Sequence, residues 1–340
     1  MAATFINPTT GRVVDQVVVG NTLPDYVFGS SVGVSPDRTM VAVTSGFATT
    51  VLDTRTRDVL ARITLPPTGA TGLDDKPYPH EGMWATEWTP DGKKLLIGVA
   101  GRTDDAQDGG LIVVDTTTWK PGRRVKLGAQ VQSIEASPDG QLIAVASSPA
   151  ENVDSGREVV WLLDAATLDL EDTLPLVDND LPIDLSFSPD GKLLAVGGSF
   201  GTLTLFDVTS GERVHQPINL HDGFVQQVEW QPDGRTVVTS ASDGTVALYD
   251  VERDIAVAVG IPGSSDLEES SGLQQGYTHL VPGTSDEITV LSGERAGHRY
   301  PMDPSVWLAD ACDVVDRDLT PVEWARYLPN RPYDHTCSDL

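Results

Sequence analysis

The sequence predicts an all-β fold assembled from repeated four-stranded units, and three observations support this class. A phrase that ends in Ser/Thr/Gln-Pro-Asp, mostly followed by Gly, recurs along the chain. Its clear copies are VGVSPDR (32–38), TEWTPDG (86–92), IEASPDG (134–140), LSFSPDG (185–191) and VEWQPDG (228–234). Their prolines, at positions 36, 90, 138, 189 and 232, follow one another at intervals of 54, 48, 51 and 43 residues. Each copy lies between β-branched or Leu-rich runs of strand length, so it marks a turn inside a repeat unit.

The elements of one unit follow in a fixed order. Proline presets φ and glycine supplies a left-handed residue, so Pro-Asp-Gly joins the first strand to the second. A Gly-containing corner leads to a third strand that closes on aspartate, and a fourth strand such as DVLARITL (58–65) completes the unit. The closing aspartates are Asp53, Asp115, Asp164, Asp207 and Asp250. One such sheet cannot cover both its faces, whereas several in a ring can, and this predicts a β-propeller.

The two ends of the repeat array predict how the ring closes. A degraded sixth copy, HLVPGTSDE (279–287), is followed by about three strands, and residues 4–22 read as two strands without a Pro-Asp turn. Closure removes exposed sheet edges, so we expect an N-terminal strand to complete the last unit, giving six blades over residues 1–303. Seven blades are the alternative, if both N-terminal strands join an additional, distorted blade. Because Met1-Ala2 leads directly into strand-like sequence, we also expect the domain to continue from a longer protein.

Residues 304–340 change period and predict a short helical tail packed on the propeller. Asp303 precedes Pro304, which suits an N-cap followed by the first helical position. Thr320 and Glu323 have the spacing of a capping box at the start of a second helix.

The fifth unit, residues 220–250, resembles the WD-repeat family. It carries His221, the corner residue Asp243 in SDGT, and Tyr249 where the family usually has tryptophan. The resemblance implies a structural hydrogen-bond chain through His221, Asp243 and a strand hydroxyl, either Thr239 or Ser240. The first three units also resemble surface-layer and quinoprotein-type propellers, which share the Ser-Pro-Asp-Gly turn.

The tail resembles a segment that follows propellers in large bacterial, mainly actinobacterial, signalling proteins such as STAND-type ATPases and multidomain regulators. The matching residues are Trp307, Ala311, Cys312, Arg317, Leu319, Thr320, Glu323, Trp324, Tyr327, Leu328, Pro329, Tyr333, Thr336 and Cys337. The resemblance implies that the chain is the sensor or docking domain of such a protein, with the ATPase elsewhere in the polypeptide. Its partner would then be another protein or an upstream effector module.

Composition excludes several partner classes. The net charge of −27 disfavours direct binding to nucleic acid or anionic lipid, and we assign it to solubility, with attraction of a basic partner as the alternative. The sequence has no apolar run near 18 residues and no visible signal peptide, so we expect a cytoplasmic protein without a membrane anchor.

Cys312 and Cys337 are the only cysteines and both lie in the tail. They could pair and staple the helices to the propeller, but in a reducing cytosol we favour two packed free thiols. Two cysteines alone do not predict a metal site.

No catalytic motif is present, because the sequence lacks a P-loop, a G-x-S-x-G elbow, H-E-x-x-H and C-x-x-C. We therefore expect a non-catalytic chain without a cofactor or metal. The segments that lead into the innermost strands converge around the channel, and their polar and aromatic residues suit a recognition surface for a protein or a small ligand. The candidate residues are Tyr26, His80, Glu81, Trp84, Gln132, Asp184, His221, Phe224, Tyr277 and His279, with Asp25, Gln130, Asp180 and Asp222 beside them.

Three alternatives stay open. The convergent residues could simply cap strands and bond loop backbone, and His221 is expected to be structural in any case. A lactonase-like hydrolase would use Glu81, His80, Asp184 and His279 at the channel mouth, and a pure scaffold would use the blade rims. The acidic inserts 102–110, 151–158 and 264–272 are expected to be solvated loops, since the spacing of Asp104, Asp105 and Asp108 fits no EF-hand.

Overall fold

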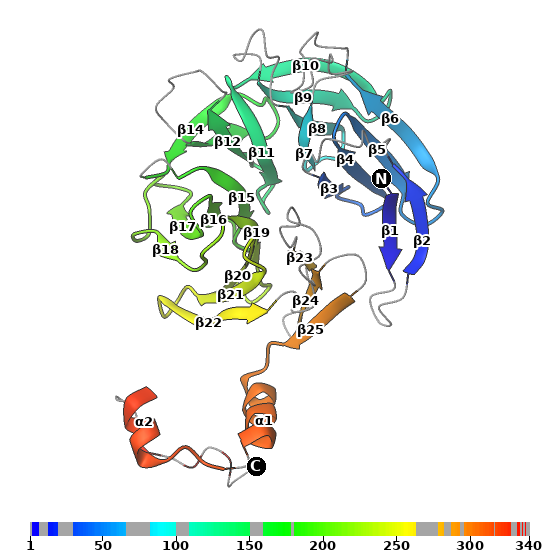
Figure 1. The fold of residues 1–340 in the computed structure, drawn as a ribbon. Helices are drawn as coiled ribbons and strands as arrows, with labels where there is room; N and C mark the ends of the chain where they lie inside the picture. The colour runs from blue at the N-terminus through cyan, green and yellow to red at the C-terminus, as the bar shows by residue number, and fades with distance from the viewer. Residues whose placement is uncertain are drawn as a thin grey trace, which may run out of the picture.

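The computed structural model describes residues 2–6, 13–19, 30–65, 82–99, 109–149, 159–177, 180–262, 278–281, 287–292, 296–315 and 317–327, and residues 332, 333, 335 and 337. In these ranges the strands form seven antiparallel sheets, and two helices follow them. Figure 1 shows the sheets arranged around a ring, with the first strand of each repeat unit nearest the centre and the fourth at the periphery. The predicted all-β class is confirmed, and the arrangement is a β-propeller.

Five sheets have four strands each, joined in chain order, and we name them blades 1 to 5. Blade 1 is β3(Ser30–Val34), β4(Met40–Ser45), β5(Ala48–Asp53) and β6(Val59–Thr64). Blade 2 is β7(Met83–Trp88), β8(Lys94–Val99), β9(Gly110–Asp115) and β10(Lys120–Lys126). Blade 3 is β11(Ala129–Ala136), β12(Leu142–Pro149), β13(Val159–Asp164) and β14(Leu170–Pro175). Blade 4 is β15(Pro182–Phe187), β16(Leu193–Gly198), β17(Thr202–Asp207) and β18(Ile218–Asn219). Blade 5 is β19(Val225–Trp230), β20(Thr236–Ala241), β21(Thr245–Asp250) and β22(Ile255–Pro262), and blade 6 has β23(Thr278–Val281), β24(Glu287–Ser292) and β25(Ala296–Pro301).

The hydrophobic core lies between neighbouring blades rather than within one sheet. In blade 2, β8 is buried from Leu95 to Val99, whereas the outermost strand β10 is mostly exposed. Val51 of blade 1 packs in one cluster with Trp88 of blade 2, and similar clusters join each later pair of blades up to blade 6. Each blade therefore depends on its neighbours to cover its apolar faces.

The Pro-Asp-Gly turns contribute to contacts between blades as well as to the hairpins. Their glycines adopt φ between 65° and 73° at Gly92, Gly140, Gly191 and Gly234. In blades 1 to 4 the hydroxyl before the proline donates to the aspartate two residues later, as Ser188 does to Asp190 over 2.8 Å. A Cβ on Gly140 would lie 3.0 Å from Pro90 of the preceding blade, and the other three glycines face the preceding proline in the same way. The turns thus stack on one another around one face of the ring.

The closing aspartates fix the turn between the third and fourth strands. The Asp164 carboxylate accepts the N–H groups of Ala166 at 3.0 Å and Thr167 at 2.7 Å, and Asp53, Asp115 and Asp207 do the same in their blades. The residue four positions after each closing aspartate has a positive φ, namely Arg57, Trp119, Leu168, Gly211 and Asp254. Backbone bonds such as Ala165 N–H to Gln141 O place this turn beside the Pro-Asp-Gly turn. We call the side that carries both sets of turns the turn face.

The N-terminus departs from the preferred expectation of six blades. β1(Ala2–Ile6) and β2(Val13–Val18) pair with each other in a two-stranded sheet, and no described strand of blade 6 pairs with them. Val19 packs against Val43 and Leu52 of blade 1, and Thr50 Oγ1 donates to Val19 O over 2.7 Å. The apolar face of this hairpin is therefore covered by blade 1, and the alternative of an additional, incomplete blade describes it better.

The tail forms the two expected helices, α1(Pro304–Val315) and α2(Pro321–Tyr327). The Ser305 N–H donates to Asp303 Oδ1 at 2.8 Å, so Asp303 caps α1. Thr320 N–H donates to Glu323 Oε2 at 2.8 Å and Glu323 N–H to Thr320 Oγ1 at 3.3 Å, which is a capping box. Trp307 packs against the cluster that joins blades 5 and 6, and Figure 1 shows the two helices extending from the ring beyond β25.

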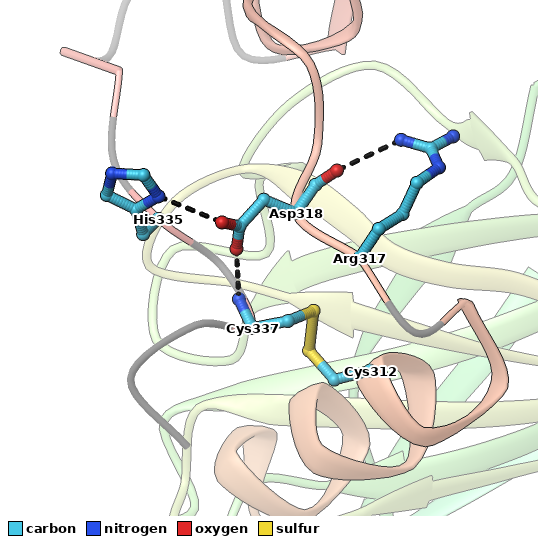
Figure 2. The surroundings of a disulfide bond; sticks show 5 residues. All are labelled: Cys312, Arg317, Asp318, His335 and Cys337. Carbon is cyan, nitrogen blue, oxygen red and sulfur yellow. Dashed lines mark hydrogen bonds and ion pairs between the residues drawn. A yellow bond between two sulfur atoms is a disulfide. The ribbon is translucent and has the colours of Figure 1, made fainter.

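The favoured interpretation of two free thiols is wrong, because Cys312 and Cys337 form a disulfide. Figure 2 shows Asp318 beside this disulfide: its carboxylate accepts the Cys337 N–H at 2.7 Å and contacts His335 Nδ1 at 2.8 Å. The bond joins α1 to the segment after α2, so it staples the tail to itself rather than to a blade. Trp324 and Tyr333, with ring centroids 5.5 Å apart, pack across the same segments.

Candidate recognition face and channel

The side opposite the turn face carries the loops that lead into the innermost strands, together with the corners between second and third strands. We call it the corner face. In blade 5 these two kinds of segment are joined through His221, which is buried in the loop before β19. Its Nδ1 lies 2.7 Å from Thr245 Oγ1 and its Nε2 lies 2.7 Å from Thr239 Oγ1. Burial lowers the pKa of His221, against the attraction of Asp243, so the ring is neutral at pH 7 and both nitrogens are used.

Asp243 completes this corner. Its carboxylate accepts the N–H groups of Thr245 at 2.9 Å and Asp222 at 2.9 Å, and its Oδ1 lies 4.0 Å from His221 Nδ1. The strand hydroxyl of the implied chain is therefore Thr239. Tyr249 lies outside the chain, because its hydroxyl donates to Asp254 and contacts His215 Nε2 at 3.2 Å.

Blade 4 builds the same corner with its carboxylate on the opposite segment. Its corner reads Ser199-Phe200-Gly201-Thr202, so phenylalanine stands where blade 5 has Asp243. Asp180, buried in the loop before β15, instead accepts hydrogen bonds from the Ser199 hydroxyl at 3.0 Å, the Phe200 N–H at 3.1 Å and the Thr202 hydroxyl. Asp180 therefore holds the loop and corner together in blade 4.

The innermost strands are joined to one another by side chains that bond the backbone of the next blade. Asp184 of blade 4 contacts both neighbours: Ser133 of blade 3 donates to its Oδ1 at 2.6 Å, and the Val228 N–H of blade 5 donates to its Oδ2 at 2.9 Å. The Phe187 N–H donates to Glu135 Oε2 at 2.9 Å across blades 3 and 4. Gln227 of blade 5 bonds both backbone groups of Leu280, at 2.8 and 3.0 Å.

Four carboxyl groups lie on the innermost strands of blades 2 to 5, namely Glu87, Glu135, Asp184 and Glu229, and we call them the channel carboxyls. Burial raises the pKa of Glu87 to about 8, of Asp184 to about 6 and of Glu229 to about 7. Burial and then repulsion from the other three raise the pKa of Glu135 well above its usual range. Each of the four residues is half-buried, and the upward direction of the pKa shifts follows from the poor solvation of the charged form.

The channel carboxyls are the residues that sequence reasoning missed, apart from Asp184. The repeat phrase shows them, because glutamate stands three positions before the proline in TEWTPDG, IEASPDG and VEWQPDG. Alternation along a strand then places these three on the same side of successive innermost strands. Serine, Ser186, holds this position in blade 4 and accepts the Trp230 N–H at 3.3 Å.

The other predicted residues are only partly brought together. Trp84 and Phe224 are half-buried at the start of β7 and β19, and Gln132 Nε2 donates to Ser148 Oγ at 2.9 Å within blade 3. Asp25, Tyr26, His80, Glu81 and Tyr277 lie outside the described residues, as do residues 102–108, 151–158 and 264–272 of the acidic inserts. His279 is described only in its backbone, within β23. No group of three or more His, Cys, Asp or Glu side chains suited to a metal ion is found in the described part of the chain.

Comparisons with known families agree with this geometry over blades 4 and 5. The family model of the anaphase-promoting complex subunit 4 WD40 domain matches residues 176–222, and that of the WD domain, G-beta repeat, matches residues 212–250. Residues 176–250 carry WD40 repeats. The second match contains His221, Thr239 and Asp243, the three residues of the corner in blade 5.

Among solved structures, the propeller is similar to hydrazine synthase of Kuenenia stuttgartiensis, with a TM-score of 0.61 and 20% sequence identity. The match covers 86% of this chain and 82% of that chain. At this identity the likeness shows the fold alone. The comparison with curated proteins finds no match. Of the helices described, none has the length and apolar character to cross a membrane.

Proposed function

We propose that this chain is a non-catalytic WD-repeat propeller that docks a protein partner on its corner face, as the sensing or docking domain of a bacterial signalling protein. The observation that carries the proposal is the structural role of four of the described polar groups at the corner face and the channel. His221, Asp184, Glu135 and Gln227 are engaged in bonds that hold corners and blades together. A general acid or base must instead reach a substrate proton.

The signalling context is supported by the sequence of the tail. The motif residues that resemble the tail of STAND-type proteins contact one another: Arg317 pairs with Glu323 at 2.8 Å, Glu323 caps with Thr320, and Trp324 stacks edge-on with Tyr333. These contacts build a small cross-linked unit directly after the last blade. Such a unit suits a domain whose contacts with an effector module change when a partner binds. The partner shifts the equilibrium between the two contact states by the difference in its affinity for them.

The test places a photo-cross-linking amino acid at Phe224 on the corner face and, as a control, at Val59 on the outermost strand of blade 1. Both chains are expressed in the native host, irradiated, and analysed by mass spectrometry. The proposal predicts cross-links from position 224 to one protein, or to another segment of the same polypeptide, and a much weaker signal from position 59. Equal labelling from the two positions would contradict docking on the corner face.

The hydrolase alternative is separated by a second measurement on the same purified chain. Stoichiometric bound metal that disappears in His80→Ala and His279→Ala, together with lactone hydrolysis, would favour an enzyme and overturn the proposal.

A further inference from the structure

The outermost strand of blade 2 is basic, although the chain as a whole is strongly acidic. β10 reads Lys-Pro-Gly-Arg-Arg-Val-Lys, and residues 109–126 hold four cations and one carboxylate, Asp115, in a chain with a net charge of −27. Figure 1 shows β10 at the periphery of the ring, and Lys120, Arg123 and Lys126 are exposed. A group of cations is therefore accessible to a partner at this part of the rim.

Protection of the sheet edge does not account for this composition. β10 has one hydrogen-bonded neighbour in its sheet, β9, and lysine on such an edge strand is one way to prevent unwanted pairing. Other outermost strands have the same kind of edge without these charges, since β6 carries one cation and β14, β18 and β22 carry none. The charges of β10 therefore need a second explanation.

Two of the four cations face blade 3. Lys120 lies opposite Asp115 of β9, on the same side of the sheet as Leu111, which packs in the cluster that joins blades 2 and 3. Arg123 donates to Thr167 O of blade 3, a neutral acceptor that leaves the charge of the guanidinium uncompensated. The Lys120 side chain forms no ion pair with any residue that the structure describes.

The other two cations face blade 1. Arg124 lies opposite Ile112, which packs in the cluster that joins blades 1 and 2, and Lys126 lies opposite Gly110, two residues earlier on β9. Because side chains alternate along a strand, Arg124 and Lys126 share this side. β10 therefore presents cations on both sides of its outer edge, over a length of roughly 20 Å.

Three neighbouring carboxylates do not cancel this charge. Asp115 accepts two N–H groups of its own turn, at 2.9 and 3.1 Å, and Asp164 of blade 3 is engaged in its turn in the same way. On β14, Asp172 lies opposite Leu162, which packs in the cluster that joins blades 3 and 4, so its side chain faces away from blade 2. An acidic ligand along β10 would thus meet mainly cations.

We propose that β10 docks a protein segment with consecutive acidic residues, which lies in an extended conformation along the outer edge of the strand. An extended segment directs successive side chains to opposite sides, so consecutive carboxylates can reach the cations on both sides of β10. The two arginines match carboxylates in shape as well as in charge.

A short acidic segment fits this site better than a nucleic acid does. A longer polyanion would also meet the acidic remainder of the chain and be repelled by it. The inference goes beyond the proposed function and does not rest on it, since β10 lies on the rim rather than on the corner face.

The test titrates the full chain into fluorescein-labelled hexaglutamate and follows the fluorescence anisotropy, with labelled hexaglutamine as the uncharged control peptide. The glutamate peptide is expected to bind at least about tenfold more tightly at low salt, through several exposed ion pairs, and to lose this preference at high salt. Lys120→Glu/Lys126→Glu should weaken its binding at least about tenfold. The matched control Arg55→Glu/Arg62→Glu makes the same change of net charge at exposed positions of blade 1 and should weaken it less than about threefold.

Equal binding of the two peptides, or equal losses in the two double variants, would overturn the proposal, because binding would then not depend on β10. Hexauridylate is titrated in parallel, and tighter binding of this RNA than of hexaglutamate would also overturn it, in favour of a nucleic-acid surface. Thermal melts check that the variants fold, and Lys120→Glu alone is a milder variant that should weaken binding by about threefold. An unchanged affinity in Lys120→Glu would contradict docking along β10.

Discussion

Blades 4 and 5 are adjacent and carry the same strand order, yet they have different residues at three equivalent places: the corner, the channel and the turn. At the corner, blade 4 uses Asp180 on the loop, whereas blade 5 uses Asp243 on the corner with His221 on the loop. At the channel, blade 4 has Ser186 where blade 5 has Glu229. In the turn, blade 4 has Ser188 where blade 5 has Gln231. At the corner both blades form equivalent bonds with different residues, whereas at the turn the bonds that Ser188 makes in blade 4 are not made by Gln231 Oε1 in blade 5.

The largest effect is expected when the corner of blade 4 loses its carboxylate. Asp180→Ala leaves the Ser199 hydroxyl, the Phe200 N–H and the Thr202 hydroxyl without their common acceptor, which should lower the free energy of unfolding by about 3 kcal/mol. Urea denaturation measures this change in the free energy of unfolding. The double variant Asp180→Ala/Phe200→Asp copies blade 5 and should recover about 1 kcal/mol through Thr202. No recovery would show that the two corners are not interchangeable.

A smaller loss is expected at the channel, and it depends on pH. The pKa of Glu229 in the folded chain is about 7, above its ordinary value of 4.5, so the folded state binds more protons between these values. Stability should therefore fall as pH rises from 5 to 8. Glu229→Gln should remove about 2 kcal/mol of that fall, measured by urea denaturation at both pH values. Ser186→Ala, the equivalent change in blade 4, is the control and should leave the pH dependence as it is.

At the corner of blade 5, Asp243→Ala should cost about 1–2 kcal/mol in urea denaturation. The loss is smaller than for Asp180 because the Asp243 side chain is 21% exposed and water can replace part of its bonding. A cost equal to or larger than that of Asp180→Ala would contradict this ranking of the two corners.

The smallest effect is a gain at the turn of blade 5. Gln231 is buried and its Oε1 has no hydrogen-bond partner among the residues that the structure describes, whereas Ser188 in blade 4 donates to Asp190 and accepts the Leu193 N–H. Gln231→Ser should let blade 5 form the same bonds and raise Tm by about 2 °C in a thermal melt. Ser188→Gln is the reverse control and should lower it.

The repeat phrase was sufficient to predict the ring of blades, because turn residues have local conformational requirements that are visible in the sequence. The number of blades was harder to predict from the sequence, since β1 and β2 have no turn motif and their position depends on packing against Val43 and Leu52. The pairing of Cys312 with Cys337 joins two segments that are 25 residues apart in sequence, and the spacing of the cysteines does not reveal that they meet.

For the candidate site, the sequence located His221 together with its structural role, and it located Asp184 without its use. Asp184 stood among possible ligand-binding and catalytic residues because it is a carboxylate near the channel. The structure shows its two oxygens shared between blades 3 and 5, a relation between three strands that no local pattern encodes. Glu87, Glu135 and Glu229 were present in the repeat phrase itself and could have been found from their common distance to the proline.

The central claim is that polar residues around the channel hold the blades together rather than carry out a reaction, and Asp184 tests it most directly. Urea denaturation at pH 7 should show that Asp184→Ala lowers the free energy of unfolding by at least about 2 kcal/mol, because the Ser133 hydroxyl and the Val228 N–H both lose their acceptor. Asp184→Asn can still accept from one partner and donate to the other, and it should stay within about 1 kcal/mol of wild type. Residues selected for reactivity often limit stability, so an alanine variant as stable as wild type, or more stable, would contradict the account.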